Sequence, residues 1–71
     1  MNKCSKDYGN FIKERRQKMG LTQEEVAKKL GISQVAYGRY ELGLREPNFS
    51  LLLQISEVLD FKPGEFFDSY L

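Results

Sequence analysis

Residues 23–42, QEEVAKKLGISQVAYGRYEL, contain the pattern that decides the fold of this chain. Two short helices that cross at a steep angle need a small residue at the crossing, a turn residue that tolerates positive φ, and an apolar anchor beside it. Ala27, Gly31 and Ile32 stand in those places. Apolar residues spaced by four and three positions would then face a shared core, namely Val26, Leu30, Tyr37 and Tyr40. The stretch therefore predicts two helices joined by a tight turn.

Helical spacing of apolar residues continues toward the N-terminus and predicts a first helix before this pair. Asp7 is a candidate cap for that helix, which ends at Gly20, a residue that accepts the left-handed C-terminal conformation. Residues 1–6 are then expected to form a flexible tail of a single domain that spans residues 1–71.

Capping signals place four more helices, so the predicted fold is all-α with five short helices. Thr22 and Glu25 form a capping box that opens the second helix, and Ser33 caps the third. Asn48 caps a fourth helix, and Pro63 suits the first turn of a fifth. The fourth helix is expected to bury the side chains of Phe49, Leu52, Leu53, Ile55, Val58 and Leu59.

The length and composition of the chain exclude several functional classes. A chain of 71 residues forms one domain with a modest core, which disfavours an enzyme with a buried active site. It has no His and only Cys4, so no metal site or cofactor is expected. No apolar run reaches the length of a membrane span, and the N-terminus lacks the apolar stretch of a signal peptide. We therefore expect a cytoplasmic protein.

The net charge of +1 averages two unlike segments. Residues 1–45 hold ten Lys and Arg against five Asp and Glu, a balance of +5. Residues 46–71 hold one Lys against five Asp and Glu, a balance of −4. The first segment would attract a phosphate backbone, but scattered positive charge on exposed helices is also typical of an ordinary solvated surface.

The segment from Ile12 to Phe67 resembles the Cro and repressor type of helix-turn-helix domain, also called the XRE family. The resemblance rests on Arg16, the L-T-Q of residues 21–23, Ala27, the L-G-I-S of residues 30–33, the ELGLREP segment at 41–47, and the helix from Asn48 to Leu59. It implies a compact five-helix domain like that of λ repressor. It also implies that the third helix lies in the major groove of double-stranded DNA.

On this basis the predicted base contacts come from the exposed face of the third helix: Gln34, Val35, Gly38 and Arg39. The amide of Gln34 matches the donor and acceptor of adenine, and the resemblance implies that Gln23 and Gln34 hydrogen-bond to each other. Arg39 could read guanine, with a phosphate contact or plain solvation as the equal alternative, and Val35 could meet a thymine methyl group. Gly38 departs from the family pattern, which indicates either close approach of the backbone to DNA or simply a weaker helix.

Phosphate contacts are predicted at helix N-termini, where free amide groups and the helix dipole favour an anion, and in the loop that follows the third helix. The residues concerned are Thr22, Gln23, Ser33, Arg45, Asn48 and Phe49. Arg16 and Glu41 align with a pair that forms a partly buried salt bridge in the family, so we predict a structural role for them.

The aromatic residues near the C-terminus are too numerous for a short last helix to bury. An exposed apolar patch needs an explanation in a monomer, and a twofold dimer would also place two reading helices about one DNA turn apart. The predicted homodimer interface consists of Phe66, Phe67, Tyr70 and Leu71.

The sequence thus predicts a transcriptional regulator, a repressor rather than an enzyme, that binds an inverted-repeat operator as a homodimer. No small-molecule inducer is expected. The alternative is an antitoxin-like module that holds a protein partner and binds DNA secondarily or not at all.

Overall fold

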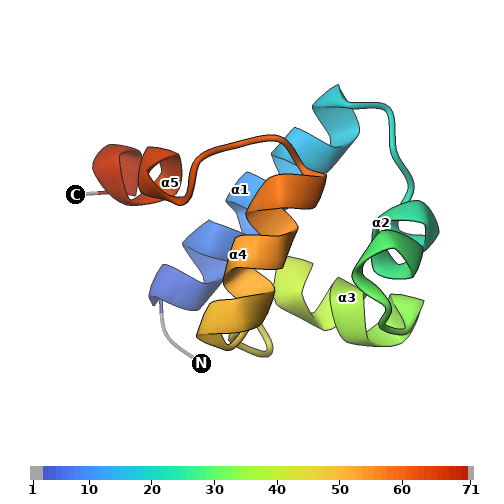
Figure 1. Cartoon of the computed structure of the whole chain (residues 1–71). Coiled ribbons are helices and arrows are strands. Elements are labelled where there is room, and N and C mark those ends of the chain that lie inside the picture. The colour runs from blue at the N-terminus through green and yellow to red at the C-terminus, as the bar shows by residue number, and fades with distance from the viewer. Residues whose placement is uncertain (1–2, 71) are drawn as a thin grey trace.

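The computed structural model describes residues 3–70 and contains five α-helices. They are α1 (Lys3–Lys18), α2 (Gln23–Leu30), α3 (Gln34–Glu41), α4 (Phe49–Val58) and α5 (Pro63–Tyr70). Figure 1 shows α1 and α4 in the middle of the molecule, with α2 and α3 on one side and α5 on the other. The predicted all-α fold with five helices is confirmed. Among the described residues, no helix is both long and apolar enough to cross a membrane.

The predicted start of the first helix is wrong. α1 begins at Lys3, so Asp7 lies inside the helix and residues 3–6 do not form a tail; Met1 and Asn2 lie outside the described residues. The reason is tertiary packing: Ser5 is buried, and its hydroxyl donates a hydrogen bond of 2.7 Å to Oε1 of Glu46 in the loop before α4.

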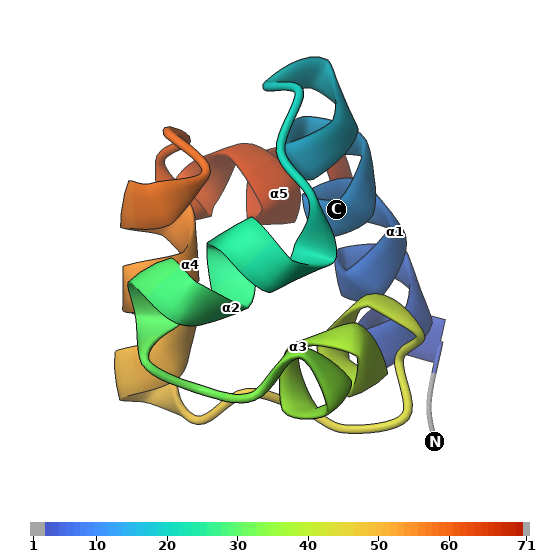
Figure 2. The same ribbon diagram turned by 90° about the vertical axis from the view of Figure 1, so that its right-hand side faces the viewer.

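The predicted caps of α2, α3 and α4 are confirmed. Figure 2 shows these three helices and the loops that precede them. Thr22 Oγ1 accepts from the Glu25 amide at 3.1 Å, and Glu25 Oε1 accepts from the Thr22 amide at 2.9 Å, which completes the capping box. Ser33 and Asn48 accept amide hydrogen bonds in the first turns of α3 and α4 at 3.1 and 2.8 Å. Gly31 ends α2 with φ of 74°, the left-handed conformation that the turn requires.

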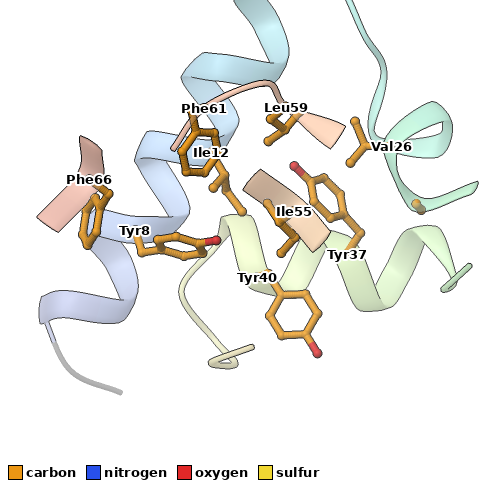
Figure 3. Packing of buried hydrophobic residues seen from close by; sticks show 10 residues of the cluster. Tyr8, Ile12, Val26, Tyr37, Tyr40, Ile55, Leu59, Phe61 and Phe66 are labelled. Carbon is orange, nitrogen blue, oxygen red and sulfur yellow. The ribbon is translucent and has the colours of Figure 1, made fainter. Parts of the chain in front are cut away.

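The core lies between α1, α2, α3 and α4 and is closed at the α5 side by aromatic rings (Figure 3). Tyr37, Ile12 and Ile55 are fully buried at its centre. Phe66 meets Tyr8 edge to face, with ring centroids 5.3 Å apart. Phe49 departs from the prediction, because its side chain is 75% exposed rather than buried. Phe49 is the first residue of α4, and its side chain faces solvent at the N-terminal end of this helix.

Arg15 of α1 caps the C-terminal end of α4 with its side chain. Arg15 Nη2 donates to the carbonyl of Leu59 at 3.3 Å and to that of Asp60, and its guanidinium lies over the Phe61 ring at 5.8 Å. A cation beside the last carbonyls of a helix satisfies acceptors that have no intrahelical partner. Arg15 thereby ties the connection between α4 and α5 to α1.

Gly9 makes the close crossing of α1 and α3 possible. A Cβ atom at this position would lie 2.4 Å from the carbonyl oxygen of Glu41 and 2.6 Å from that of Tyr40. Both atoms belong to backbone, which cannot rotate away as a side chain can. The end of α3 is therefore held against α1 at a distance that only glycine allows.

We predict that Gly9→Ala destabilises the protein by about 1–3 kcal/mol, the usual range for overpacking. The substitution would otherwise favour a helix by up to about 1 kcal/mol, so the sign of the change is informative. Gly64→Ala is the matched control, because its Cβ would meet only Asp68 Oδ2, at 3.9 Å. Urea unfolding followed by circular dichroism measures both variants. A Gly9→Ala protein as stable as wild type would contradict the close crossing.

Candidate nucleic-acid interface

The outward face of α3 carries the predicted base-contacting residues. Gln34, Val35 and Arg39 are exposed, and Gly38 lies between them with partial exposure. They line one shallow depression together with Gln23 at the start of α2 and two leucines that follow, Leu42 and Leu44. No acidic side chain is among the lining residues of this depression. This depression thus offers amides, a guanidinium and apolar groups, with no acidic side chain in its lining to repel an anion.

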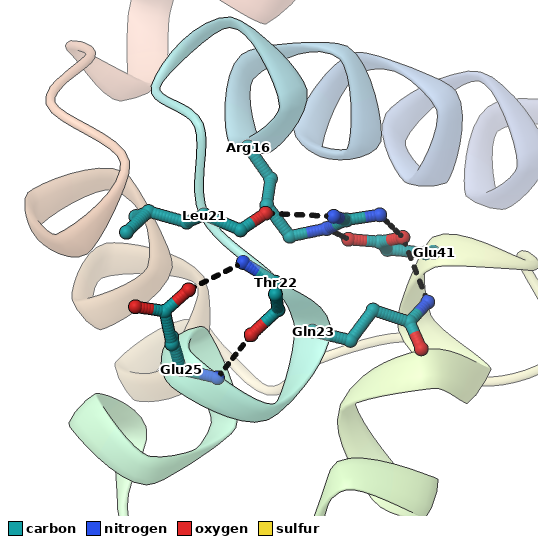
Figure 4. A network of polar contacts seen from close by, with 6 residues as sticks. All are labelled: Arg16, Leu21, Thr22, Gln23, Glu25 and Glu41. Atoms are coloured by element: carbon teal, nitrogen blue, oxygen red, sulfur yellow. Dashed lines mark hydrogen bonds and ion pairs between the residues drawn. The ribbon is translucent and has the colours of Figure 1, made fainter.

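Glu41 organises the residues behind this face (Figure 4). The residue is only 4% exposed, and its carboxylate accepts hydrogen bonds from Arg16 Nε at 2.6 Å and Arg16 Nη2 at 3.1 Å. Arg16 Nη1 also donates to the carbonyl of Leu21 at 2.9 Å. The structure therefore contains the Arg16–Glu41 salt bridge, which joins α1, the loop before α2 and the end of α3.

Gln23 takes a different partner from the one that the resemblance implies. Its Nε2 donates to Glu41 Oε1 at 3.0 Å rather than to Gln34. The amide oxygen is turned toward α3, where it lies 3.5 Å from the place that a Cβ of Gly38 would occupy. Glu41 thus orients Gln23 so that its Oε1 remains an acceptor at the edge of the depression.

Burial and hydrogen bonding act in opposite directions on Glu41. Burial by itself would raise the pKa of the carboxyl group, but the hydrogen bonds from Arg16 and Gln23 outweigh it and the pKa is lowered. The same hydrogen bond to Glu41 raises the pKa of Arg16. Burial, with the nearby Glu41 carboxylate as a second cause, raises the pKa of Tyr37. The group behind α3 is therefore an ionised pair beside a neutral phenol at neutral pH.

The three helix N-termini near this face differ in charge. The first turn of α2 contains Glu24 and Glu25, whereas the first turns of α3 and α4 contain no acid. Asn48 and Phe49 at the start of α4 are both exposed, as are Ser33 and Arg45. Figure 2 shows the start of α4 and the loop before it at the same end of the molecule as α3. The N-terminus of α4 is therefore better suited to an anion than that of α2.

Sequence reasoning missed some residues at this surface. Leu42 and Leu44 are 65% and 59% exposed, and they flank the C-terminal end of α3. Lys6, Asn10 and Lys13 of α1 line a second depression that adjoins the first. The spacing of these α1 residues at intervals of four and three is visible in the sequence, but their position beside α2 depends on how the helices cross.

The structure divides the aromatic cluster at the C-terminus. Phe66 is 4% exposed and packs against Tyr8, Phe11 and Phe67, so it belongs to the core of its own chain. Phe67 is 41% exposed and remains available at the surface. Leu71 and the side chain of Tyr70 lie outside the described residues.

This fold, with two short helices at a tight turn and a polar face on the second, defines a helix-turn-helix protein of the repressor and Cro type. The chain belongs to the Helix-turn-helix family, whose model matches residues 12–66, nearly the span that the sequence predicts. The curated relatives that the chain matches are named HTH-type transcriptional regulators.

Individual relatives agree with this assignment. The uncharacterized HTH-type transcriptional regulator YqaE of Bacillus subtilis is 49% identical over 53 residues, which are 75% of this chain and 46% of that protein. The chain spans less than half of the length of the curated relatives it matches.

Two solved structures share the fold. The restriction-modification controller protein C.AhdI of Aeromonas hydrophila aligns with a TM-score of 0.81 and 31% identity over 87% of this chain and 94% of that chain. The P22 c2 repressor in complex with a synthetic operator aligns with a TM-score of 0.78 and 34% identity over 83% of this chain and 89% of that one.

The lowered pKa of Glu41 predicts a loss of stability in acid. Its stabilising effect is complete above the ordinary pKa of 4.5 and disappears as the pH falls through the lower pKa of the folded protein. The free energy of unfolding of wild type should therefore fall below about pH 4.5, while that of Glu41→Gln should change less over the same range. At neutral pH Glu41→Gln should cost about 1–3 kcal/mol, because Arg16 loses its charged partner.

Urea titrations at several pH values measure this difference. Glu25→Gln is the matched control: the hydrogen bond from the Thr22 amide lowers the pKa of Glu25, but this residue is exposed and Gln can also complete a capping box. Parallel pH profiles for wild type and Glu41→Gln would show that Glu41 does not couple ionisation to folding.

Proposed function

We propose that this chain binds double-stranded DNA in a sequence-specific manner and acts as a transcriptional repressor, with α3 in the major groove. The observation that carries the proposal is the depression on α3, where Gln34, Val35 and Arg39 lie exposed with no acidic neighbour in the lining. The relation to the P22 c2 repressor, which was solved with a synthetic operator, supports it.

The dimensions and chemistry of α3 suit this role. A helix of eight residues is about 12 Å long, and the major groove admits a helix across its width of about 12 Å. Gln34, in the first turn, would pair with the N6 and N7 atoms of adenine, and Val35 would contact a thymine methyl group. Arg39, one turn further along, would reach guanine or a phosphate.

The presence of glycine at position 38 is best explained by close approach of DNA to α3. A Cβ here would be at ordinary contact distance, 3.5 Å, from its nearest neighbour, so the fold itself does not require glycine. Glycine nevertheless costs the helix about 1 kcal/mol relative to Ala. We infer that the missing side chain lets the α3 backbone come close to the DNA.

The remaining predicted contacts would position α3 on the duplex without reading sequence. Asn48 and Phe49 present the N-terminus of α4 to one phosphate, and Arg45 adds a cation in the loop before it. Ser33 at the start of α3, with Thr22 and Gln23 at the start of α2, would meet the backbone on the other side of the groove. The acidic first turn of α2 makes its contact the weaker of these.

A homodimer would match an inverted-repeat operator. Phe67 is the described apolar residue of the C-terminal cluster that is left at the surface, and Tyr70 and Leu71 follow it in the chain. A twofold contact through α5 would cover this surface and repeat α3 in a second half-site.

Gln34→Ala and Arg45→Ala should weaken DNA binding in different ways. Gln34→Ala is expected to cost about 1–3 kcal/mol on the preferred operator and little on random duplex, because it removes a base contact. Arg45→Ala should weaken both duplexes alike and reduce the slope of log affinity against log salt by about one per phosphate contact. An operator selected from a random duplex pool provides the substrate for fluorescence anisotropy titrations.

Both variants must show the circular dichroism and melting temperature of wild type. If Gln34→Ala binds the selected operator as tightly as wild type and with the same preference, α3 does not read the sequence as proposed. If wild type selects no sequence and instead recovers a stoichiometric protein partner from its host, the interaction module is the better description.

The dimer makes a separate prediction. Sedimentation equilibrium at micromolar concentration should give twice the chain mass, and Phe67→Ser should shift the equilibrium toward monomer because it removes exposed apolar surface from α5. Met19→Ser is the control, since Met19 is equally exposed, at 42%, but lies beyond the end of α1. A wild type that stays monomeric on operator DNA would overturn the dimer.

A further inference from the structure

The exposed face of α1 that carries Lys6, Asn10 and Lys13, called the α1 flank below, lies beside the exposed surface of α3. Lys6, Asn10 and Lys13 line a depression together with Gln23, Glu41 and Leu42. Gln23 and Leu42 also line the depression on α3, so the two hollows share an edge. A ligand that lies across α3 and the start of α2 would reach the α1 flank next.

The charge on this flank is positive and unpaired. Lys6, Asn10 and Lys13 follow one another at intervals of four and three, which places them on one helix face, and Gln17 continues the row. No acid stands in that row. Within the described residues neither lysine forms an ion pair, and the carboxylate of Glu41, which lines the same depression, is bound by Arg16 and Gln23.

The position of the flank relative to α3 is fixed by backbone packing. Gly43, directly after α3, approaches Lys6 so closely that a Cβ on the glycine would lie 2.7 Å from the Lys6 Cα. Gly9, one turn further along α1, is in similar contact with the carbonyl groups of Tyr40 and Glu41. The two lysines are thus held at a fixed distance and direction from α3. A phosphate contact that fixes the position of α3 along the DNA requires such a fixed placement.

We propose that Lys6, Asn10 and Lys13 bind phosphate groups of the operator backbone beyond those at the start of α2, so that each chain covers DNA outside the base pairs that α3 reads. This inference rests on the proposed DNA binding. Lysine at an exposed helix face is usually no more than a solvated charge. Here the row adjoins the depression on α3, the acid that lines its own depression, Glu41, is paired with Arg16, and glycine contacts hold α1 against the end of α3.

The test compares two double variants that remove the same amount of charge. Lys6→Gln/Lys13→Gln removes the cations of the flank while keeping most of each side-chain stem. Lys18→Gln/Lys62→Gln is the control, because the end of α1 and the connection between α4 and α5 lie at the opposite end of the molecule from α3 in both views (Figures 1 and 2). Lys13→Gln alone is included in case the double variant at the flank is unstable.

Affinity for the selected operator is measured against salt concentration, and ethylation interference maps the phosphates that the protein touches. We expect the slope of log affinity against log salt to fall by about 0.9 for each phosphate that is no longer neutralised, about 2 per chain, in Lys6→Gln/Lys13→Gln. Lys13→Gln should show about half of that decrease, and the control should keep the wild-type slope. The outermost phosphates that interfere with wild-type binding should cease to interfere in the flank variant.

The outcomes separate the two proposals. If wild type binds its operator and the flank and control variants have equal slopes and equal interference patterns, the α1 contact is wrong while DNA binding stands. If wild type selects no operator at all, the proposed function fails first.

Discussion

The buried carboxylate of Glu41 is the constraint on which the arrangement of the first three helices depends. A carboxylate that is 4% exposed is costly unless donors satisfy it, and those donors come from two other elements, Arg16 of α1 and Gln23 of α2. Because Arg16 also holds the Leu21 carbonyl, the loop between α1 and α2 is fixed by the same group. Moving any one of these helices would leave a charge or a donor buried without its partner.

That network acts at the C-terminal end of α3 and leaves the N-terminal end exposed. Glu41 is the last residue of α3, and Gly9 allows its backbone to rest directly on α1. Gln34 lies two turns away and is exposed. A short helix that is clamped at one end and capped at the other by Ser33 presents its side chains from a defined direction without needing stability of its own. This accounts for a helix that tolerates Gly38 in its middle.

Local chemistry makes part of this predictable from the sequence. Caps at Thr22, Ser33 and Asn48 depend on neighbours within three residues, and each one is found where the sequence predicts it. The start of α1 is not predictable in this way, because the first turn of this helix packs against a loop distant in sequence, where Ser5 is buried and donates to Glu46. The exposure of Phe49 and the Gln23–Glu41 bond likewise depend on how separate helices cross. At the surface, the residues of α3 follow from the pattern, whereas the α1 flank does not.

The distribution of charge explains how a chain with a net charge of only +1 could still approach DNA in one orientation. Glu57, Asp60 and Glu65, with Lys62 among them, line one depression where α4 meets α5, at the end of the molecule away from α3 (Figure 1). Lys6, Lys13, Arg39 and Arg45 lie in α1, in α3 and in the loop after it. Because Lys18 and Lys62 also lie at the far end, the two ends differ in their balance of acids and bases rather than being purely of opposite sign, and the α3 end is the more basic one. The field of a phosphate backbone would both attract such a molecule and orient it with its α3 end toward the DNA. Salt screens this field. Added salt should therefore reduce the rate of encounters in the binding orientation more steeply than the rate of all encounters.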